Sequence, residues 1–344
     1  MVLPSEFGTV PELEAYLSQP TPEVVEALAQ LDGDVMVLGA GGKMGPTLAL
    51  LAARSVAAGG LEKRVIGVSR FSDARVARTL AEGGVETIAL DMMEEGALDR
   101  LPGVKNIVYM VGSKFGTTGQ EGRTWAINAF LPGVVARRFR SSRFVVFSSG
   151  NVYPLSPVAR ADCTEEIPPA PIGEYAQSVL GRERVFSYFS EAYDIPAVLF
   201  RLNYAVEMRY GVLIDIARKV WLGEPVDLSM GHVNVIWQGD ANAYALRALA
   251  LAETPPLALN VTGPETLSVR ALARRFGELL GRTPVFVGAE APDALLSDAQ
   301  QAFTRMGYPR VPVGKVIEWV AGWIVAGGAV YDKPTKYQVR NGRF

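Results

Sequence analysis

The sequence predicts an α/β protein in which a doubly wound parallel sheet carries a smaller C-terminal domain. Short runs rich in β-branched residues alternate with longer helix-like segments, which is the pattern of successive strand–helix–strand units. A glycine-rich turn at residues 39–45 lies between the first such strand and the first such helix. With 344 residues, of which 49% are hydrophobic and 20% charged, the chain has the composition of a globular protein with a sizeable core.

Six segments are predicted to be strands, because each is a short apolar run. They are Asp34–Leu38, Arg64–Val68, Glu86–Leu90, Asn106–Val111, Phe144–Phe147 and Ala197–Leu202. The segments between them have helical patterns: Pro46 suits a first helical turn, and Ser72 precedes its helix as a cap would. The predicted helices are Pro46–Ala58, Asp73–Glu82, Glu94–Leu101, Glu121–Arg138 and Glu174–Tyr193. Right-handed crossovers would place helices on both faces of the sheet.

The order of these elements predicts how the chain is divided. Residues 1–33 form a helical N-terminal extension, and residues 34–204 form the sheet domain, to which a later segment of about 232–262 returns. Residues 205–231 and 263–330 build the smaller domain over the carboxyl ends of the strands, where ligands of open α/β sheets bind. Residues 331–344 form a basic, polar tail that either folds over the neighbouring surface or remains loose.

The glycine-rich turn predicts a dinucleotide site, because a strand runs directly into it and a helix leaves it. Gly39 permits the tight turn, Gly42 lets the backbone approach a pyrophosphate, and Gly45 allows close packing of the helix. Around Lys43 and Met44, the helix N-terminus would supply amide donors and the positive end of the helix dipole. The sequence therefore predicts a Rossmann-type domain that binds NADP or NAD.

The end of the second predicted strand bears on the choice between these two cofactors. A protein that binds unphosphorylated NAD usually has a carboxylate there, whereas this sequence has Ser69 and Arg70. A guanidinium makes bidentate contacts with phosphate, so Arg70, together with Lys43 from the glycine-rich turn, could bind a 2′-phosphate, which favours NADP. Alternatively, Arg70 is a solvated residue at a strand end. Asp91 either bonds the adenine amino group or caps the following helix. The other residues predicted to line the cofactor site are Met92, Val111 and Gly112.

Further motifs resemble the extended short-chain dehydrogenase/reductase family, which includes sugar-nucleotide epimerases and dehydratases. The family's G-x-x-G-x-x-G pattern is matched at residues 39–45, its helix asparagine by Asn128, and its serine-bearing strand end by Phe147–Tyr153. Arg201–Tyr204 resembles the strand after the active-site helix, and Asn260–Ser268 resembles the turn that opens the last segment. The resemblance covers residues 34 to about 285, and it implies a homodimer built on the helices at 121–138 and 174–193.

The resemblance also implies a reaction centre, with one departure. In the family a tyrosine is the general acid and base, a serine bonds the reacting oxygen, and a lysine four residues after the tyrosine lowers its pKa. Tyr175 and Ser149 match the first two, but Val179 holds the lysine position. Lys114, after the fourth strand, is expected to replace the lost cation unless it is a solvated loop residue. The second candidate is Arg182, two turns beyond Tyr175 on about the same face of its helix.

A second departure concerns the substrate. Sugar-nucleotide members of the family commonly carry an arginine for the diphosphate at the position where this chain has His232. His232 is the only histidine, so a metal site built on several imidazoles is excluded, and a structural role for this side chain is the alternative. Arg209 could bind an anionic substrate, and Asn151 and Asn203 are the other candidate substrate residues. We expect a sugar-like or other polyhydroxylated small molecule and no metal.

Charge and composition argue against other classes of partner. Lys plus Arg (34) nearly balance Asp plus Glu (36), so no global field would attract nucleic acid or an anionic membrane. No apolar run approaches the ~20 residues of a membrane span. Cys163 is the only cysteine, and residues 1–20 carry three glutamates and no basic residue, unlike a signal peptide. We therefore expect a cytoplasmic protein.

Two functions remain open at this point. The first is an NAD(P)-dependent epimerase, dehydratase or reductase that transfers hydride at the nicotinamide. The alternative, which Val179 and His232 favour, is a catalytically weakened dinucleotide-binding protein that serves as a sensor or a subunit. The enzyme is the preferred hypothesis, because Ser149 and Tyr175 both persist at the family spacing.

Overall fold

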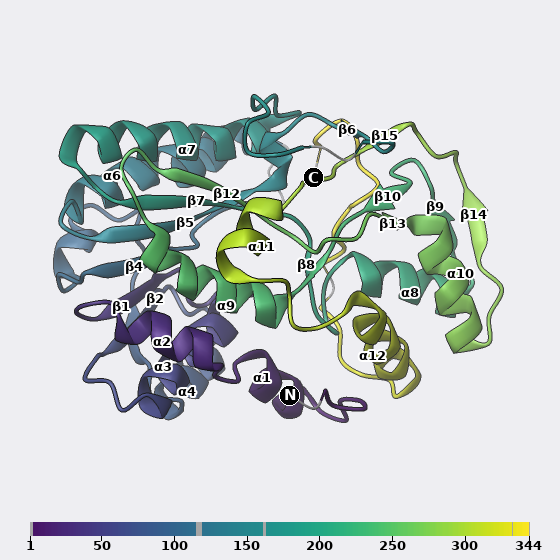
Figure 1. Ribbon diagram of the computed structural model, residues 1–344, viewed down its shortest axis with the longest axis horizontal. Coiled ribbons are helices and arrows are strands. Elements are labelled where there is room, and N and C mark those ends of the chain that lie inside the picture. Colours follow the sequence, from purple (N-terminus) through teal and green to yellow (C-terminus); the bar gives the residue numbers. More distant parts are fainter. Residues whose placement is uncertain (1–2, 115–118, 161–162, 332, 344) are drawn as a thin grey trace.

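A seven-stranded sheet lies at the centre of the protein, and we describe it from a computed structural model that covers residues 3–114, 119–160, 163–331 and 333–343. Its strands are β1 (Val35–Leu38), β2 (Val65–Ser69), β3 (Glu86–Ala89), β4 (Asn106–Tyr109), β5 (Arg143–Ser149), β7 (Ala197–Leu202) and β12 (Leu257–Val261). Their order in the sheet is β12-β7-β5-β4-β1-β2-β3, and every neighbouring pair is parallel (Figure 1). The order reverses direction between β1 and β4, so the predicted doubly wound fold is confirmed.

The middle strands are buried on both faces. Every residue of β1 and of β4 is buried, which explains why these segments are continuous apolar runs without alternation. Register is regular: Val35 lies opposite Val65 on one side and Asn106 on the other. The carboxyl ends of β1, β2 and β4 therefore reach the same edge of the sheet, where the glycine-rich turn begins.

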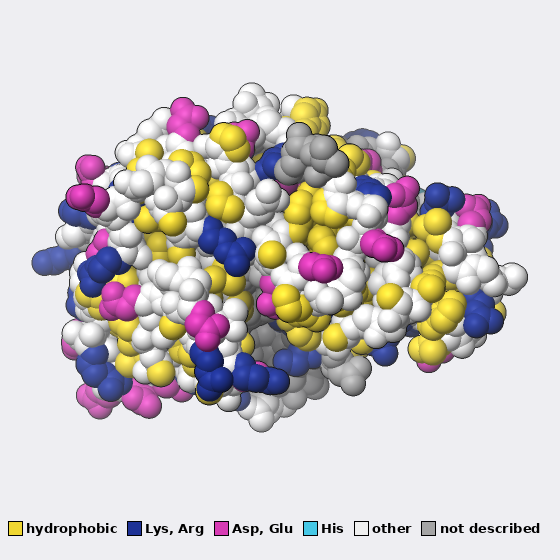
Figure 2. Space-filling model, turned by 90° about the horizontal axis from the view of Figure 1, so that it is seen from below, with side chains coloured by type: hydrophobic (Ala, Val, Ile, Leu, Met, Phe, Trp, Pro, Cys, Tyr) yellow, Lys and Arg dark blue, Asp and Glu magenta, His cyan; other side chains and the backbone are white. Residues whose placement is uncertain are grey.

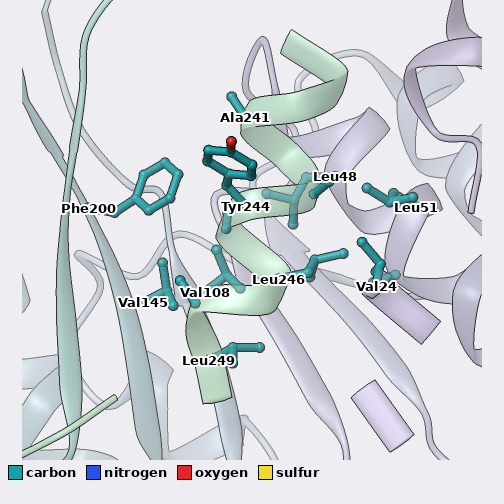
Figure 3. Close-up of a cluster of buried hydrophobic side chains, with 14 of the residues drawn as sticks. Val24, Leu48, Leu51, Val108, Val145, Phe200, Ala241, Tyr244, Leu246 and Leu249 are labelled. Atoms are coloured by element: carbon teal, nitrogen blue, oxygen red, sulfur yellow. The ribbon is translucent and has the colours of Figure 1, made fainter. Parts of the chain in front are cut away.

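One face of the sheet is covered by α3 (Gly45–Ala58), α9 (Gln238–Ala248), α2 (Pro22–Ala29) and α11 (Gln300–Met306). In Figure 3, α9 lies beside the N-terminal helices, with Tyr244 near Phe200 of β7 and Leu246 towards Val24 of α2, and both α9 and α3 contact the sheet. The helix α4 (Ala74–Glu82) packs beside α3 and β3. Its N-cap is Asp73, whose carboxylate accepts a hydrogen bond from the Arg75 amide, rather than the predicted Ser72.

The other face is covered by α6 (Leu131–Arg138) and α7 (Glu174–Tyr193). Two predicted helices differ from the structure here. The segment predicted as a helix over 94–101 contains only the 3₁₀ turn η1 (Ala97–Arg100), because Gly96 before it has a φ of 67° and cannot continue a right-handed helix. The helix predicted over 121–138 is α5 (Glu121–Trp125), a π-helical turn η2 (Ala126–Phe130) and α6 in succession.

A second hydrophobic core lies beyond the carboxyl ends of the strands, in the right half of Figure 1. Its helices are α8 (Val212–Leu222), α10 (Val269–Leu280) and α12 (Val313–Val325). Its short strand pairs are β9 (Pro225–Asp227) with β14 (Val285–Val287) and β10 (His232–Val233) with β13 (Leu267–Ser268). The segment predicted to return to the sheet domain is shared between the two cores: Val233 and Trp237 belong to the second core, whereas Ile236 and α9 belong to the sheet-side core, and α11 also lies against the sheet.

The N-terminal extension joins the two cores. Val24 and Leu28 of α2 pack with the sheet-side core, whereas Leu13 and Leu17 of α1 (Val10–Leu17) belong to the second core. Phe7 contacts the Trp319 ring edge-on at a centroid distance of 4.9 Å. Removing residues 1–33 would therefore expose apolar surface on both cores.

The C-terminal tail folds over the second core, which settles the alternative left open by the sequence. Both the amide and the hydroxyl of Thr335 donate to Oδ2 of Asp215 on α8, at 2.7 and 2.5 Å. Arg340 forms an ion pair with Asp293 of β15 (Asp293–Ala294), the strand that pairs with β6 (Ser156–Pro157). Further on, Gly342 lies so close to Gly173, just before α7, that no side chain fits at either position. In Figure 1 this yellow segment runs between the two parts of the molecule.

Lys, Arg, Asp and Glu side chains are interspersed on the face seen in Figure 2. This mixture agrees with the near balance of charges in the sequence. Among the described residues, no helix is both long and apolar enough to cross a membrane.

Candidate active site

The turn between β1 and α3 depends on glycines at closely packed positions. Gly39 has a φ of 97°, a conformation that residues with a Cβ rarely adopt. A Cβ at Gly45 would lie 2.6 Å from the carbonyl oxygen of Gly39, and one at Gly41 would lie 2.7 Å from Oγ of Ser69. No side chain caps the N-terminus of α3, which begins with these glycines. Its first amides therefore have no side-chain cap among the residues that the structure describes, and they fit the phosphates of a dinucleotide.

A pocket opens beside this turn, at the carboxyl ends of β1, β2 and β4. It is lined by Gly39, Gly41, Gly42, Ser69, Arg70, Phe71, Ser72, Asp73, Val76, Leu90, Asp91, Met92, Met93, Met110, Val111, Gly112, Arg123, Ile127 and Leu131. Most of the predicted cofactor residues are in this lining. Met44 and Gly45 lie instead at the start of α3, and the Lys43 side chain points towards Tyr210.

Sequence reasoning missed several walls of this pocket. Phe71 directly follows the predicted Arg70, and its φ of 45° marks a local turn that no sequence motif announces. Arg123 and Ile127 come from the helix that passes over the strand ends, and only a three-dimensional arrangement brings them to the pocket. Of these residues, only Phe71 could have been predicted from the sequence, because it directly follows Arg70.

Arg70 and Asp91 lie next to each other in the lining of the pocket. Nη1 of Arg70 lies 4.0 Å from Oδ2 of Asp91, and both side chains are partly exposed. The other carboxylate oxygen of Asp91 accepts a hydrogen bond from the amide of Met93 at 3.0 Å. The guanidinium predicted to meet a 2′-phosphate therefore has a carboxylate beside it.

Ser149, Asn151 and Tyr175 come together where β5 ends and α7 begins. The Ser149 hydroxyl donates to Oδ1 of Asn151 at 3.0 Å and accepts from the Asn151 amide at 3.2 Å. A hydrogen bond also links Ser149 to the Tyr175 hydroxyl. Burial raises the pKa of Tyr175, while the charge of Arg182 and the hydrogen bond to Ser149 act to lower the pKa.

Arg182 is buried under this group, with an exposed fraction of 5%. Its Nη1 donates to the carbonyl of Phe147 at 2.5 Å, and its Nε and Nη2 donate to the carbonyl and the side chain of Asn128 at 3.2 and 3.0 Å. A Cβ on Gly112, which lines the pocket, would lie 2.9 Å from Nη2. The guanidinium thus stands between the end of the dinucleotide pocket and Tyr175, and its charge acts on the tyrosine.

The position of the missing lysine is apolar. Val179 is 1% exposed and packs in a small cluster with Val152, Tyr153 and Cys163, which Tyr175 borders. A lysine here would have to place its ammonium among hydrocarbon groups or extend past them. The valine is therefore part of a consistent local structure.

Two lysines reach the same region from other segments. Nζ of Lys114 lies 5.6 Å from the centroid of the Tyr175 ring, and Nζ of Lys43 lies 3.3 Å from that of the Tyr210 ring. Burial lowers the pKa of Lys114 to about 8. Burial also lowers the pKa of Lys43 to about 7, and the neighbouring charge of Lys114 contributes.

The predicted substrate residues other than Asn151 are held within the fold. Asn203 donates to Oδ1 of Asn234 at 2.9 Å, and it is 3% exposed. Arg209 forms ion pairs with Glu14 at 2.6 Å and Glu207 at 3.0 Å, so its charge is balanced inside the protein. His232 lies on β10, paired with β13, close to Glu290. Among the described contacts, none joins His232 to the Ser149–Tyr175 pair.

A buried polar network that sequence reasoning missed lies under the end of β5. Glu183 of α7 accepts hydrogen bonds from Arg201 of β7 at 2.8 and 3.0 Å and from Ser148 at 2.5 Å. Arg201 also donates to the Tyr153 hydroxyl, which in turn donates to Asn260 at 2.9 Å. This network ties α7 to β5, β7 and β12, and so it fixes the positions of Ser149 and Tyr175.

The fold and this site define a dinucleotide-binding α/β protein with a serine–tyrosine pair beside the pocket. The family model described as "NAD dependent epimerase/dehydratase family" matches residues 35–211, slightly more than half of the chain. The chain belongs to this family. No curated protein matches the chain in sequence.

Solved structures share the fold over most of the chain. UDP-glucuronic acid 4-epimerase from Bacillus cereus, in complex with UDP-glucuronic acid and NAD, is 15% identical with a TM-score of 0.70, covering 85% of this chain and 99% of that one. UDP-glucose 4-epimerase from Thermotoga maritima, with UDP-glucose, is 16% identical with a TM-score of 0.69, covering 86% and 99%. UDP-glucose 4-epimerase from Thermus thermophilus, in complex with NAD, is 19% identical with a TM-score of 0.69, covering 86% and 100%. At these identities the likeness shows the fold alone.

Proposed function

We propose that this chain is an NAD-dependent enzyme of the epimerase, dehydratase or reductase type that acts on a sugar-like or other polyhydroxylated substrate. The observation that carries the proposal is the hydrogen-bonded Ser149–Tyr175 pair beside the dinucleotide pocket. In its ionised form, a tyrosine phenol held next to a serine hydroxyl can take a proton from a substrate alcohol and return it when the alcohol is formed again. Bound NAD would supply the hydride acceptor and donor for that oxidation.

The residues of the chain divide the remaining work. Tyr175 holds and moves the proton, and Ser149 positions the reacting oxygen. Asn151 orients the Ser149 hydroxyl through two hydrogen bonds. In place of the absent lysine, the fixed charge of Arg182 stabilises the ionised phenol from below, and Lys114 lies over the face of the ring. We propose that this pair of cations does the work that Lys114 alone was expected to do.

The surroundings of Arg70 support NAD over NADP. Asp91 lies 4.0 Å from the Arg70 guanidinium, and its negative charge would repel a 2′-phosphate bound by that guanidinium. The glycine-rich turn and the strand ends line the pocket, and the N-terminus of α3 lies beside it. These are the elements that a dinucleotide site requires. The NAD in two of the related structures agrees with this choice.

We also propose a cytoplasmic homodimer that forms through α5, α6 and α7. Phe130 of η2, between α5 and α6, is 66% exposed, and Tyr188 and Tyr193 of α7 are 67% and 42% exposed. Large apolar side chains in such numbers on adjoining helices are typical of an interface between subunits.

A second function is a dinucleotide-binding sensor or subunit with weak catalysis. Two observations favour it: Val179 replaces the family lysine, and burial raises the pKa of Tyr175. In that case the pocket would bind NAD, and substitution at Ser149 or Tyr175 would leave the function unchanged, because the function would depend on NAD binding and not on catalysis.

The first experiment is to denature the purified protein, identify any nicotinamide cofactor that is released, and then titrate the emptied protein with NAD and NADP. We expect NAD to be held or to bind more tightly. A protein that binds neither cofactor would refute the proposal.

The second experiment separates the enzyme from the sensor. Tyr175→Phe should lower turnover of any substrate found by screening sugars and sugar nucleotides by about 100-fold to 10,000-fold, because it removes the general acid and base. NAD affinity is the control and should remain unchanged. Unchanged turnover in Tyr175→Phe and in Ser149→Ala would contradict the enzyme.

A further inference from the structure

Lysines from two other segments gather around Lys43, near Tyr175. Lys43 belongs to the glycine-rich turn, Lys114 follows β4, and Lys333 is in the C-terminal tail. The charges of Lys114 and Lys333 both act on Lys43, so each of them lies within electrostatic reach of it, and Lys114 also lies over the Tyr175 ring. Such a gathering of like charges raises the energy of the site unless an anion occupies it.

Aromatic rings fix the two inner lysines in place. Nζ of Lys43 lies 3.3 Å from the centroid of the Tyr210 ring, and Nζ of Lys114 lies 5.6 Å from that of the Tyr175 ring. Burial raises the pKa of Tyr210, and the charge of ionised Tyr175 also raises it, so these two rings lie close enough to interact electrostatically. The two ammonium groups therefore border the position at which Tyr175 would meet a substrate.

The charged groups that face Lys43 include both signs. Besides burial, the charges of Lys114 and Lys333 destabilise the protonated form of Lys43 and lower its pKa, whereas Asp215 of α8 stabilises that form. Asp215 accepts two hydrogen bonds from Thr335, so part of its charge is already engaged by the tail. Burial lowers the pKa of Lys43 to about 7 and that of Lys114 to about 8, and a bound oxyanion would restore both to the charged form.

We propose that Lys43, flanked by Lys114, binds an oxyanion of the substrate, a carboxylate or a phosphate, next to the carbon that reacts at Tyr175. The inference rests on the proposed function and narrows its substrate to acidic polyhydroxylated compounds. The other cationic candidate for such a group, Arg209, is neutralised by Glu14 and Glu207. Lys43 was predicted only as a cofactor residue, beside Arg70 at a 2′-phosphate, whereas its side chain lies over the Tyr210 ring, which points to this different use.

The test is calorimetric titration of the full-length protein, previously saturated with NAD, with three ligands on one carbon skeleton: glucose, glucuronate and glucose 6-phosphate. We expect at least one acid to bind about ten-fold or more tightly than glucose, because a charge-assisted contact strengthens binding by this order. The acid that binds identifies the oxyanion as a carboxylate or a phosphate. Its binding at pH 8 should take up protons, which titration in buffers of different ionisation enthalpy measures.

Lys43→Met and Lys114→Met should each weaken binding of the acid about ten-fold, and Lys43→Met should reduce the proton uptake. Lys105→Met is the matched control, because Lys105 is exposed at the opposite end of the strand that Lys114 follows. Three results would overturn the inference: both acids bind no more tightly than glucose, neither acid binds, or Lys43→Met leaves binding of the acid unchanged. Loss of acid binding on saturation with NAD would also overturn it, because the lysines would then serve the cofactor phosphates.

Tyr175→Phe keeps failure of this inference separate from failure of the proposed function. In this variant the acid should still bind, whereas turnover should be lost. Acid binding with normal turnover would contradict the proposed function alone, and loss of turnover without a preference for acids would contradict this inference alone.

Discussion

At the scale of single residues, the site is defined by a lysine that is absent and by an arginine that lies near its place. Val179 is packed among Val152, Tyr153 and Cys163, so the helix position at which the sequence motif of the family has a lysine is apolar here. Arg182 lies further along α7 and anchors itself on Asn128 and the Phe147 carbonyl. The positive charge has thus been kept near the tyrosine, although it comes from a different position.

Restoring the lysine should therefore damage the protein rather than improve it. Val179→Lys would bury an amine in the small apolar cluster, at a cost on the order of 2–4 kcal/mol in the free energy of unfolding. Urea unfolding measures the loss, and Val179→Ile, which keeps the site apolar, should change stability by less than about 1.5 kcal/mol. A large gain in turnover with unchanged stability would mean that the enzyme is merely degraded.

The ionisation of Tyr175 should depend on Arg182. Burial raises the pKa of Tyr175 and the guanidinium lowers it, so removing the charge moves the pKa upward. We expect Arg182→Met to shift the Tyr175 titration to higher pH, and Arg182→Lys to shift it less. Ultraviolet difference titration detects the phenolate, with Tyr175→Phe as the blank that identifies its step. An identical titration in Arg182→Met and the wild-type protein would assign the cation to Lys114.

At the scale of elements, the sequence predicted the strands well and the irregular segments poorly. Buried strands such as β1 and β4 are continuous apolar runs, and the glycine-rich turn marks the first crossover. The failed helix at 94–101 contains Gly96 in a left-handed conformation, which tertiary context selects and composition does not reveal. The π-helical turn within 121–138 likewise has no sequence signature that separates it from an α-helix.

The same limit applies to the site. Ser149 and Tyr175 could be predicted, since each stands in a motif with a fixed place relative to a strand or helix. The contact of Arg182 with Asn128 spans 54 residues, and the approach of Lys43 to Tyr210 joins the glycine-rich turn to the second core. Such pairs arise only when the crossovers and the second core are assembled, so spacing along the chain does not reveal them.

The ion pair between α7 and β7 should be essential for stability. Glu183 and Arg201 are 3% and 7% exposed in their side chains, with Nη2 and Oε2 2.8 Å apart. Glu183→Gln leaves the arginine charge buried without its partner, and we expect a loss of about 3–5 kcal/mol in the free energy of unfolding. The control is Glu278→Gln in the exposed Arg275–Glu278 pair, which should change stability by less than about 1 kcal/mol. Equal effects of the two substitutions would show that water reaches Glu183.

At the scale of the whole molecule, the two chain ends join the parts that build the site. The N-terminal extension contributes Leu28 to the sheet-side core and Leu13 to the second core, and Glu14 reaches Arg209 at 2.6 Å. The tail runs from α8 to Gly173, directly before the helix that carries Tyr175. Tyr175 and Lys114 come from the sheet domain, whereas Tyr210 and Lys333 come from the second core and the tail, so the site requires both parts to be held together.

This arrangement predicts that the tail stabilises the second core without affecting the dinucleotide pocket. Tyr337 is 2% exposed within the second core, and no tail residue is in the lining of the pocket described above. Tyr337→Ala should therefore lower the free energy of unfolding by about 3–5 kcal/mol, as truncation of a buried aromatic side chain does, while NAD affinity changes less than about two-fold. The partly exposed Val339 provides the control, because Val339→Ala should have a much smaller effect on stability. If Tyr337→Ala weakened NAD binding in proportion to the loss of stability, the sheet domain and the second core would unfold as one unit. The prediction that the tail stabilises only the second core would then be wrong.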